Sequence, residues 1–159
     1  MSSSLTSVCL PDMDWQDEFC KVSLPSSVQT FEFWGHSLFR KEAELWVEHL
    51  PSLSTIILCM QDCEQESDSD FDCCQELSQS ACMPRLPRSL CHLIVSSRCV
   101  ARLLEMHAQD CLWFCTDMQQ LTLPHGCLVH PEGGLRAFLK GPRVGYVHVF
   151  HKDFHWHQC

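Results

Sequence analysis

The sequence predicts an α/β fold: a small, mostly parallel sheet built from two βαβ units, with an antiparallel hairpin appended at its C-terminal end. Apolar runs of strand length occur at residues 53–60 and 90–96. Amphipathic segments with helical spacing occur at residues 37–50 and 97–109. Strands that alternate with helices favour a parallel sheet with right-handed crossovers.

The first βαβ unit begins at residues 28–34, where aromatic and β-branched residues alternate between two faces as in a strand. A Gly-His-Ser turn follows, and Phe39, Ala43 and Trp46 then recur at helical spacing. Pro51 predicts the end of that helix. The continuous apolar run at residues 53–60 is typical of a buried parallel strand.

The second unit begins with the strand predicted at residues 90–96, and Ser97 can cap a helix that runs to about Gln109. Residues 111–116 form a third buried apolar run. Three strand-like pieces follow at residues 119–123, 135–140 and 144–151, and the last two flank a Lys-Gly-Pro-Arg turn typical of a hairpin. No internal repeat is evident at the periods of solenoid proteins.

The predicted organisation is a flexible N-terminal arm over residues 1–27 and a single α/β domain over residues 28–159. An acidic loop insertion interrupts the domain at residues 61–82, where seven acids occur without a base. Within it, Ser67 and Ser69 each have an acid three residues downstream, which predicts phosphorylation by an acid-directed kinase.

Composition restricts the partners and the compartment. The formal net charge is −9, with 15 acids and 3 bases in residues 1–80 against 5 acids and 8 bases in residues 81–159. This balance argues against direct nucleic-acid binding. No apolar run is long enough for a membrane span, and the N-terminal residues do not resemble a signal peptide. The protein is therefore not expected to be secreted. Its thirteen cysteines, an odd number, predict reduced thiols in the cytoplasm or nucleus.

Catalytic signatures are missing from the sequence: it has no phosphate-binding glycine motif and no nucleophile elbow. The candidate chemistry is a zinc site in the C-terminal cluster. His151, His155, His157 and Cys159 would share one face if this segment continued as a strand, and imidazole and thiolate are suitable zinc ligands.

Two functions are therefore expected from the sequence. The first is a non-catalytic intracellular subunit or adaptor that binds protein partners within a larger assembly, because aromatic residues, methionine and cysteine are plentiful whereas lysine is scarce. The alternative is a zinc-binding module that uses the C-terminal His/Cys cluster. No other cofactor is expected, and the oligomeric state stays open.

Overall fold

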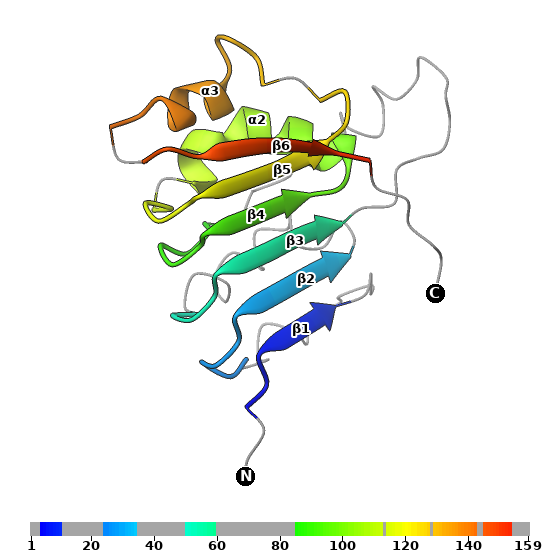
Figure 1. Ribbon diagram of the computed structural model, residues 1–159, viewed down its shortest axis with the longest axis vertical. Helices are drawn as coiled ribbons and strands as arrows, with labels where there is room; N and C mark the ends of the chain where they lie inside the picture. Colours follow the sequence, from blue (N-terminus) through cyan, green and yellow to red (C-terminus); the bar gives the residue numbers. More distant parts are fainter. Residues whose placement is uncertain are drawn as a thin grey trace.

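A computed structural model describes residues 4–10, 24–34, 50–59, 85–112, 114–127, 129–142 and 145–153. These residues include six strands and two helices (Figure 1). Their bounds, in chain order, are β1 (Ser7–Leu10), β2 (Thr30–Trp34), β3 (Thr55–Cys59), β4 (His92–Val95), α2 (Arg98–Cys111), β5 (Gln120–Pro124), α3 (Gly134–Leu139) and β6 (His148–Lys152).

All six strands lie in one sheet, side by side in the order of the chain, and every neighbouring pair is parallel. The predicted α/β class and the parallel sheet are confirmed. The predicted division into two βαβ units and an antiparallel hairpin is wrong, because all six strands form one continuous parallel sheet. Residues 135–140 belong to helix α3, and β6 pairs in parallel with β5. A parallel pair needs a crossover connection, and α3 lies within the one that joins β5 to β6.

Most of the other predicted elements agree with the structure where it describes them. The strands predicted at residues 28–34, 53–60 and 90–96 contain β2, β3 and β4. Those predicted at residues 119–123 and 144–151 include all but the last residue of β5 and β6, and α2 follows Ser97 as predicted. The run at residues 111–116 buries Cys111, Leu112 and Cys115, but it forms the end of α2 and a turn instead of a strand.

Other predictions lie outside the described residues. They are the helix over residues 37–50 except its last residue, Leu50, the acidic insertion at residues 61–82 with Ser67 and Ser69, and most of the N-terminal arm. The described part of the arm includes β1, which pairs with β2, so residues 7–10 belong to the sheet.

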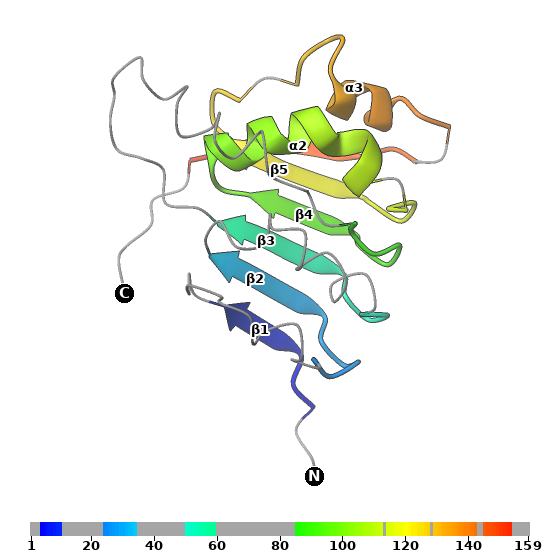
Figure 2. The ribbon, with the colours of Figure 1, turned by 180° about the vertical axis from the view of Figure 1, so that it is seen from behind.

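The hydrophobic core lies on one face of the sheet, under α2. The helix buries Val100, Leu103, Leu104 and Ala108, and it packs against β4, β5 and α3 (Figure 2). Each strand contributes alternate side chains to this core, as a pleated sheet requires. The strand residues most completely buried here are Phe31, Phe33, Ile56, Leu58, Leu93, Val95, Leu121 and Leu123.

The register reveals an internal repeat. The aligned residues Val8, Phe31, Ile56, Leu93, Leu121 and Val149 are separated by 23, 25, 37, 28 and 28 residues. From β2 to β5, each strand contains two buried apolar residues, and a third precedes the strand at a fixed spacing. These triplets are Val28/Phe31/Phe33, Leu53/Ile56/Leu58, Leu90/Leu93/Val95 and Met118/Leu121/Leu123.

Backbone hydrogen bonds repeat with the same period. The N–H groups of Ser54 and Thr55 both donate to the carbonyl of Gln29, at 2.9 and 3.0 Å. The same forked arrangement recurs at the carbonyls of Thr6, Ser54 and Cys91, each in the equivalent position of its own repeat. Because each repeat satisfies its backbone groups against its neighbour in the same way, the strands stack in chain order.

Side-chain hydroxyls reinforce the turns that precede the strands. Ser27 Oγ donates to the carbonyl of Leu5, and Ser89 Oγ donates to the carbonyl of Leu53, both at 2.7 Å. Each serine directly precedes the first apolar residue of its repeat. The carbonyl that accepts its hydrogen bond belongs to the corresponding first apolar residue of the preceding repeat. These hydrogen bonds therefore link neighbouring turns at the N-terminal ends of the strands.

Candidate functional site: the open face of the sheet

The face of the sheet opposite the core is the candidate functional site, and we call it the open face. No described helix covers it: α2 lies behind the sheet in Figure 1 and in front of it in Figure 2, and α3 packs against α2. The register arranges its side chains in two rows across the six strands. The first row is Ser7, Thr30, Thr55, His92, Gln120 and His148, and the second is Cys9, Glu32, Ile57, Ile94, Thr122 and Phe150.

These two rows are accessible and almost uncharged. Every member except Thr122 is partly or fully exposed. Glu32 is the only Asp, Glu, Lys or Arg among the twelve residues, and Lys152 follows at the end of β6. A broad face of half-exposed threonine, isoleucine, histidine and aromatic side chains is suited to contact with another macromolecule, since little charge would have to be desolvated.

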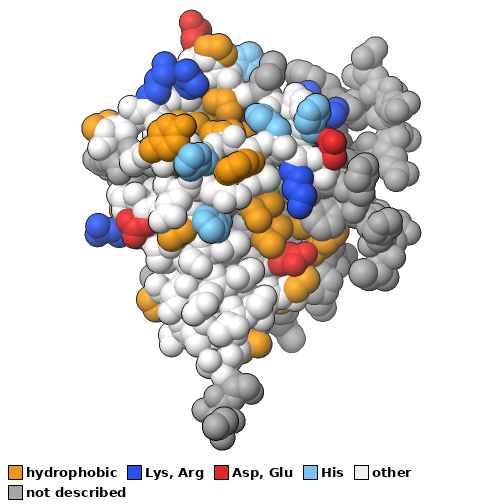
Figure 3. Space-filling view, viewed as in Figure 1, with side chains coloured by type: hydrophobic (Ala, Val, Ile, Leu, Met, Phe, Trp, Pro, Cys, Tyr) orange, Lys and Arg blue, Asp and Glu red, His pale blue; other side chains and the backbone are white. Residues whose placement is uncertain are grey.

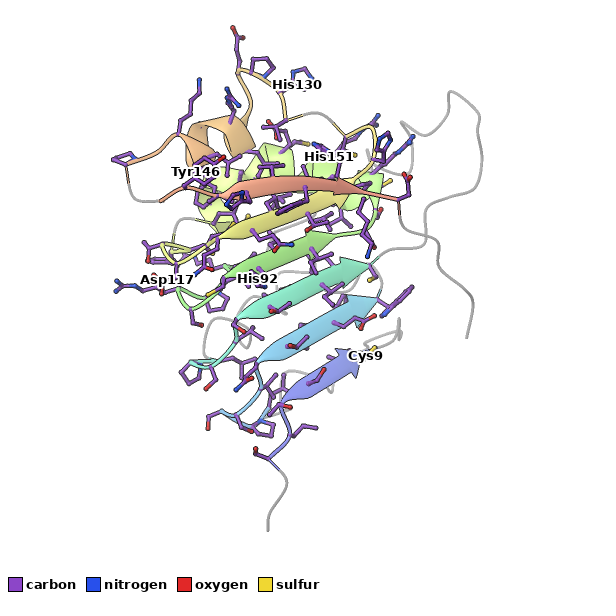
Figure 4. The ribbon with its side chains drawn as sticks, in the orientation of Figure 1. Cys9, His92, Asp117, His130, Tyr146 and His151 are labelled. Atoms are coloured by element: carbon purple, nitrogen blue, oxygen red, sulfur yellow. The ribbon has the colours of Figure 1, made fainter. Side chains whose placement is uncertain are left out.

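Aromatic rings and histidines gather at the β6 end of the open face. In the space-filling view, hydrophobic and histidine side chains concentrate over β4, β5 and β6 (Figure 3). Tyr146 contacts His148 edge to face at 4.7 Å between ring centroids, and His148 lies 6.0 Å from Phe150. Tyr146 is 82% exposed and Phe150 is 49% exposed, which is unusual for rings of this size. We call these three residues the aromatic strip; Figure 4 labels Tyr146 at its start.

The opposite end of the open face holds a hydrogen-bonded pair. The indole Nε1–H of Trp34 donates to Oε1 of Glu32 at 2.7 Å, which fixes both side chains on β2. Cys9 lies beside Glu32 at the end of β1 (Figure 4). Burial and the Glu32 carboxylate raise the pKa of the Cys9 thiol, although a hydrogen bond with Trp34 opposes this. A thiol in this setting is a poor nucleophile at neutral pH.

The buried cysteines are also unsuited to catalysis. The seven cysteines among the described residues are free thiols. Burial raises the pKa of Cys59 to about 11 and that of Cys115 to about 12, and it raises the pKa of Cys111 further. The Sγ atoms of Cys111 and Cys115 donate weak hydrogen bonds to backbone carbonyls. These residues therefore act as small apolar core side chains.

The zinc prediction stays a prediction. His151 is an exposed residue of β6, whereas His155, His157 and Cys159 lie outside the described residues. Within the part of the chain that the structure describes, no group of three or more His, Cys, Asp or Glu side chains could hold a metal ion. His151 aligns with Leu123, which faces the core, so it is on the face opposite the aromatic strip.

The open face was not identified from the sequence. Its residues come from six strands whose aligned positions are 23 to 37 residues apart, so no local motif contains them. The alternation at residues 28–34 assigned Val28, Thr30, Glu32 and Trp34 to one face. This is correct for the last three, which belong to β2, but wrong for Val28, which precedes the strand and is buried in the core. The signal that extends this face to the other strands is the recurring apolar triplet, which marks where each strand begins.

Comparison of the chain with protein-family models, with curated proteins and with solved structures finds no match. In the described residues, no helix has the length and apolar character needed to cross a membrane.

Proposed function

We propose that this chain is a non-catalytic subunit or adaptor that binds a protein partner on the open face of its sheet. The observation that carries the proposal is the face itself: two aligned rows of accessible, nearly uncharged side chains that extend across six strands. The free thiols of the described residues are consistent with a reducing compartment, the cytoplasm or nucleus.

The repeat supports this proposal. Parallel strands stacked in chain order, with an apolar triplet spaced as L-x-x-L-x-L, resemble the arrangement of leucine-rich repeats. Solenoids of this kind bury one face of their strands under the connecting segments and use the other face as an extended binding surface. Fold alone does not determine function, so the proposal depends on the chemistry of the open face.

A matched pair of substitutions tests the proposal. Thr55→Arg places a bulky cation in the middle of the first row, where its aliphatic stem can lie along the surface and its charge can stay in water. Met106→Arg is the control, because Met106 is 62% exposed on α2, away from the open face. Each variant and the parent are purified from cells under mild conditions, and the associated proteins are quantified by mass spectrometry.

The expected result is at least one protein that is retained stoichiometrically by the parent and by Met106→Arg but is depleted about tenfold or more by Thr55→Arg, the size of effect produced by disrupting an interface centre. Circular dichroism checks that both variants fold. Retention of every associated protein by a folded Thr55→Arg variant would show that binding, if any, uses another surface.

A further inference from the structure

The aromatic strip gives one end of the open face a distinct chemistry. Tyr146 and Phe150 expose most or half of their surface, and both contact the imidazole of His148 between them. Their ring contacts hold them in place, so a partner would lose little side-chain entropy when it packs against them. Exposed aromatic rings of this kind are the usual anchors of protein interfaces.

The two rows next to the strip contain no carboxylate. On the open face of β4, β5 and β6, the two rows contain His92, Ile94, Gln120, Thr122, His148 and Phe150, and none of these is a carboxylate. Histidine gains a positive charge when it is protonated, and Gln120 offers an amide that donates to Thr122 Oγ1 at 3.2 Å. These six residues can therefore accommodate the carboxylates of a partner without repulsion from a like charge.

The carboxylates nearest to these strands in the sequence do not belong to the two rows. Asp117 lies in the turn before β5 and accepts a hydrogen bond from Thr116 Oγ1 at 3.1 Å. Asp153 follows β6 and lies 4.0 Å from Nδ1 of His125. Glu32 is three strands away from β5, or about 14 Å, which exceeds the screening length of about 8 Å in physiological salt.

We infer that the open face of β4–β6 binds an acidic polypeptide segment, one in which carboxylates flank aromatic or aliphatic side chains. The inference rests on the proposed function and assigns a partner chemistry to that surface. The apolar side chains pack on Tyr146 and Phe150, and the carboxylates face imidazoles and an amide. A basic segment would find no carboxylate among these six residues. The net charge of −9 on the whole chain would attract such a segment to other surfaces.

The test uses a displayed library of random dodecapeptides selected against the full chain at neutral pH and low salt. Enriched peptides are synthesised, and their affinities are measured for the parent and for two matched pairs of variants. Gln120→Glu adds a carboxylate to the strip's surroundings, and Gln109→Glu makes the same change on the exposed side of α2. Phe150→Ser removes an anchor, and Phe114→Ser removes a ring of similar exposure, 44%, from the turn after α2.

The expected peptides combine Asp or Glu with aromatic or aliphatic residues. Their affinity falls about tenfold or more in Phe150→Ser and several-fold in Gln120→Glu, it falls further as salt is raised, and it is unchanged in the two control variants. Enriched peptides that are neutral or basic but still depend on Phe150 would overturn the inferred chemistry and leave the open face as the binding surface. An absence of enrichment, or peptides insensitive to both open-face variants, would overturn the inference and count against the proposed function as well.

Discussion

Glu105 is a charged side chain placed where a charge is costly. Both carboxylate oxygens are buried without a full hydrogen bond in the structure, at the contact between α2 and the start of α3. Desolvation raises the pKa of Glu105, while the backbone N–H of Leu135 and the nearby His130 act in the opposite direction. The net effect favours the neutral form of the side chain in the folded protein.

The raised pKa gives Glu105 a definite effect on stability. The folded state binds the proton more tightly than the unfolded chain, so this residue lowers the free energy of unfolding as pH rises above about 4.3, the ordinary value for Glu. We expect Glu105→Gln to unfold at higher urea concentration than the parent at pH 7 and at a similar concentration near pH 4. The gain is below about 1 kcal/mol, because Glu105 as a whole is only half-buried and solvent screens its charge.

The control is Glu132→Gln, since Glu132 is exposed in the turn just before α3. Urea unfolding of the three proteins at several pH values measures the effect. A parent that is more stable than Glu105→Gln at pH 7 would mean that the Leu135 N–H and His130 outweigh desolvation.

Among the elements, α3 shows why local sequence misled the prediction. Residues 135–140 form a short apolar window, and a window of this length does not distinguish a strand from a helix by periodicity. Leu135, Arg136, Ala137, Leu139 and Lys140 are nevertheless good helix formers. The deciding contact is with α2, a partner 30 residues earlier in the chain, and single-segment reasoning does not include it.

The contact between α2 and α3 depends on a glycine. A Cβ atom built on Gly134 would lie 2.5 Å from the backbone carbonyl oxygen of Glu105, which belongs to α2 and has no rotamer by which to move away. We expect Gly134→Ala to lower the free energy of unfolding by about 1–3 kcal/mol through overpacking. Gly145→Ala is the control, because nothing lies within 4 Å of its added Cβ. Thermal unfolding of both variants decides, and equal midpoints for Gly134→Ala and the parent would contradict the close approach.

Across the described residues, the sequence was sufficient for the class of fold and for the location of five of the six strands, β2 to β6, because each is a short strand-like run bounded by turns. It was insufficient for the repeat. The positions of the triplet are filled by Val, Phe, Ile, Leu and Met, and the intervals between repeats vary from 23 to 37 residues. Only the register of the sheet, which no single segment encodes, shows that these apolar runs are equivalent.

The repeat also predicts how many residues of the acidic insertion can be deleted. The interval from Ile56 to Leu93 is 37 residues, nine more than the 28 residues of each of the next two intervals. If nine residues are excess, deletion of residues 64–72 gives this interval the 28 residues of the two intervals that follow it. The deleted stretch carries five acids together with Ser67 and Ser69, and no base.

We expect this deletion to keep β3 and β4 paired in the same register and to change the free energy of unfolding by about 1 kcal/mol or less, because closing a loop depends only weakly on its length. For a chain of this size the midpoint of thermal unfolding then moves by about 4 °C or less. The matched control deletes nine residues from the interval between β4 and β5, residues 101–109 of α2, and should abolish cooperative unfolding because it removes Leu103, Leu104 and Ala108 from the core. A loss of cooperativity in the first deletion as well would mean that residues 64–72 are part of the repeat, and that the third interval is long for a structural reason.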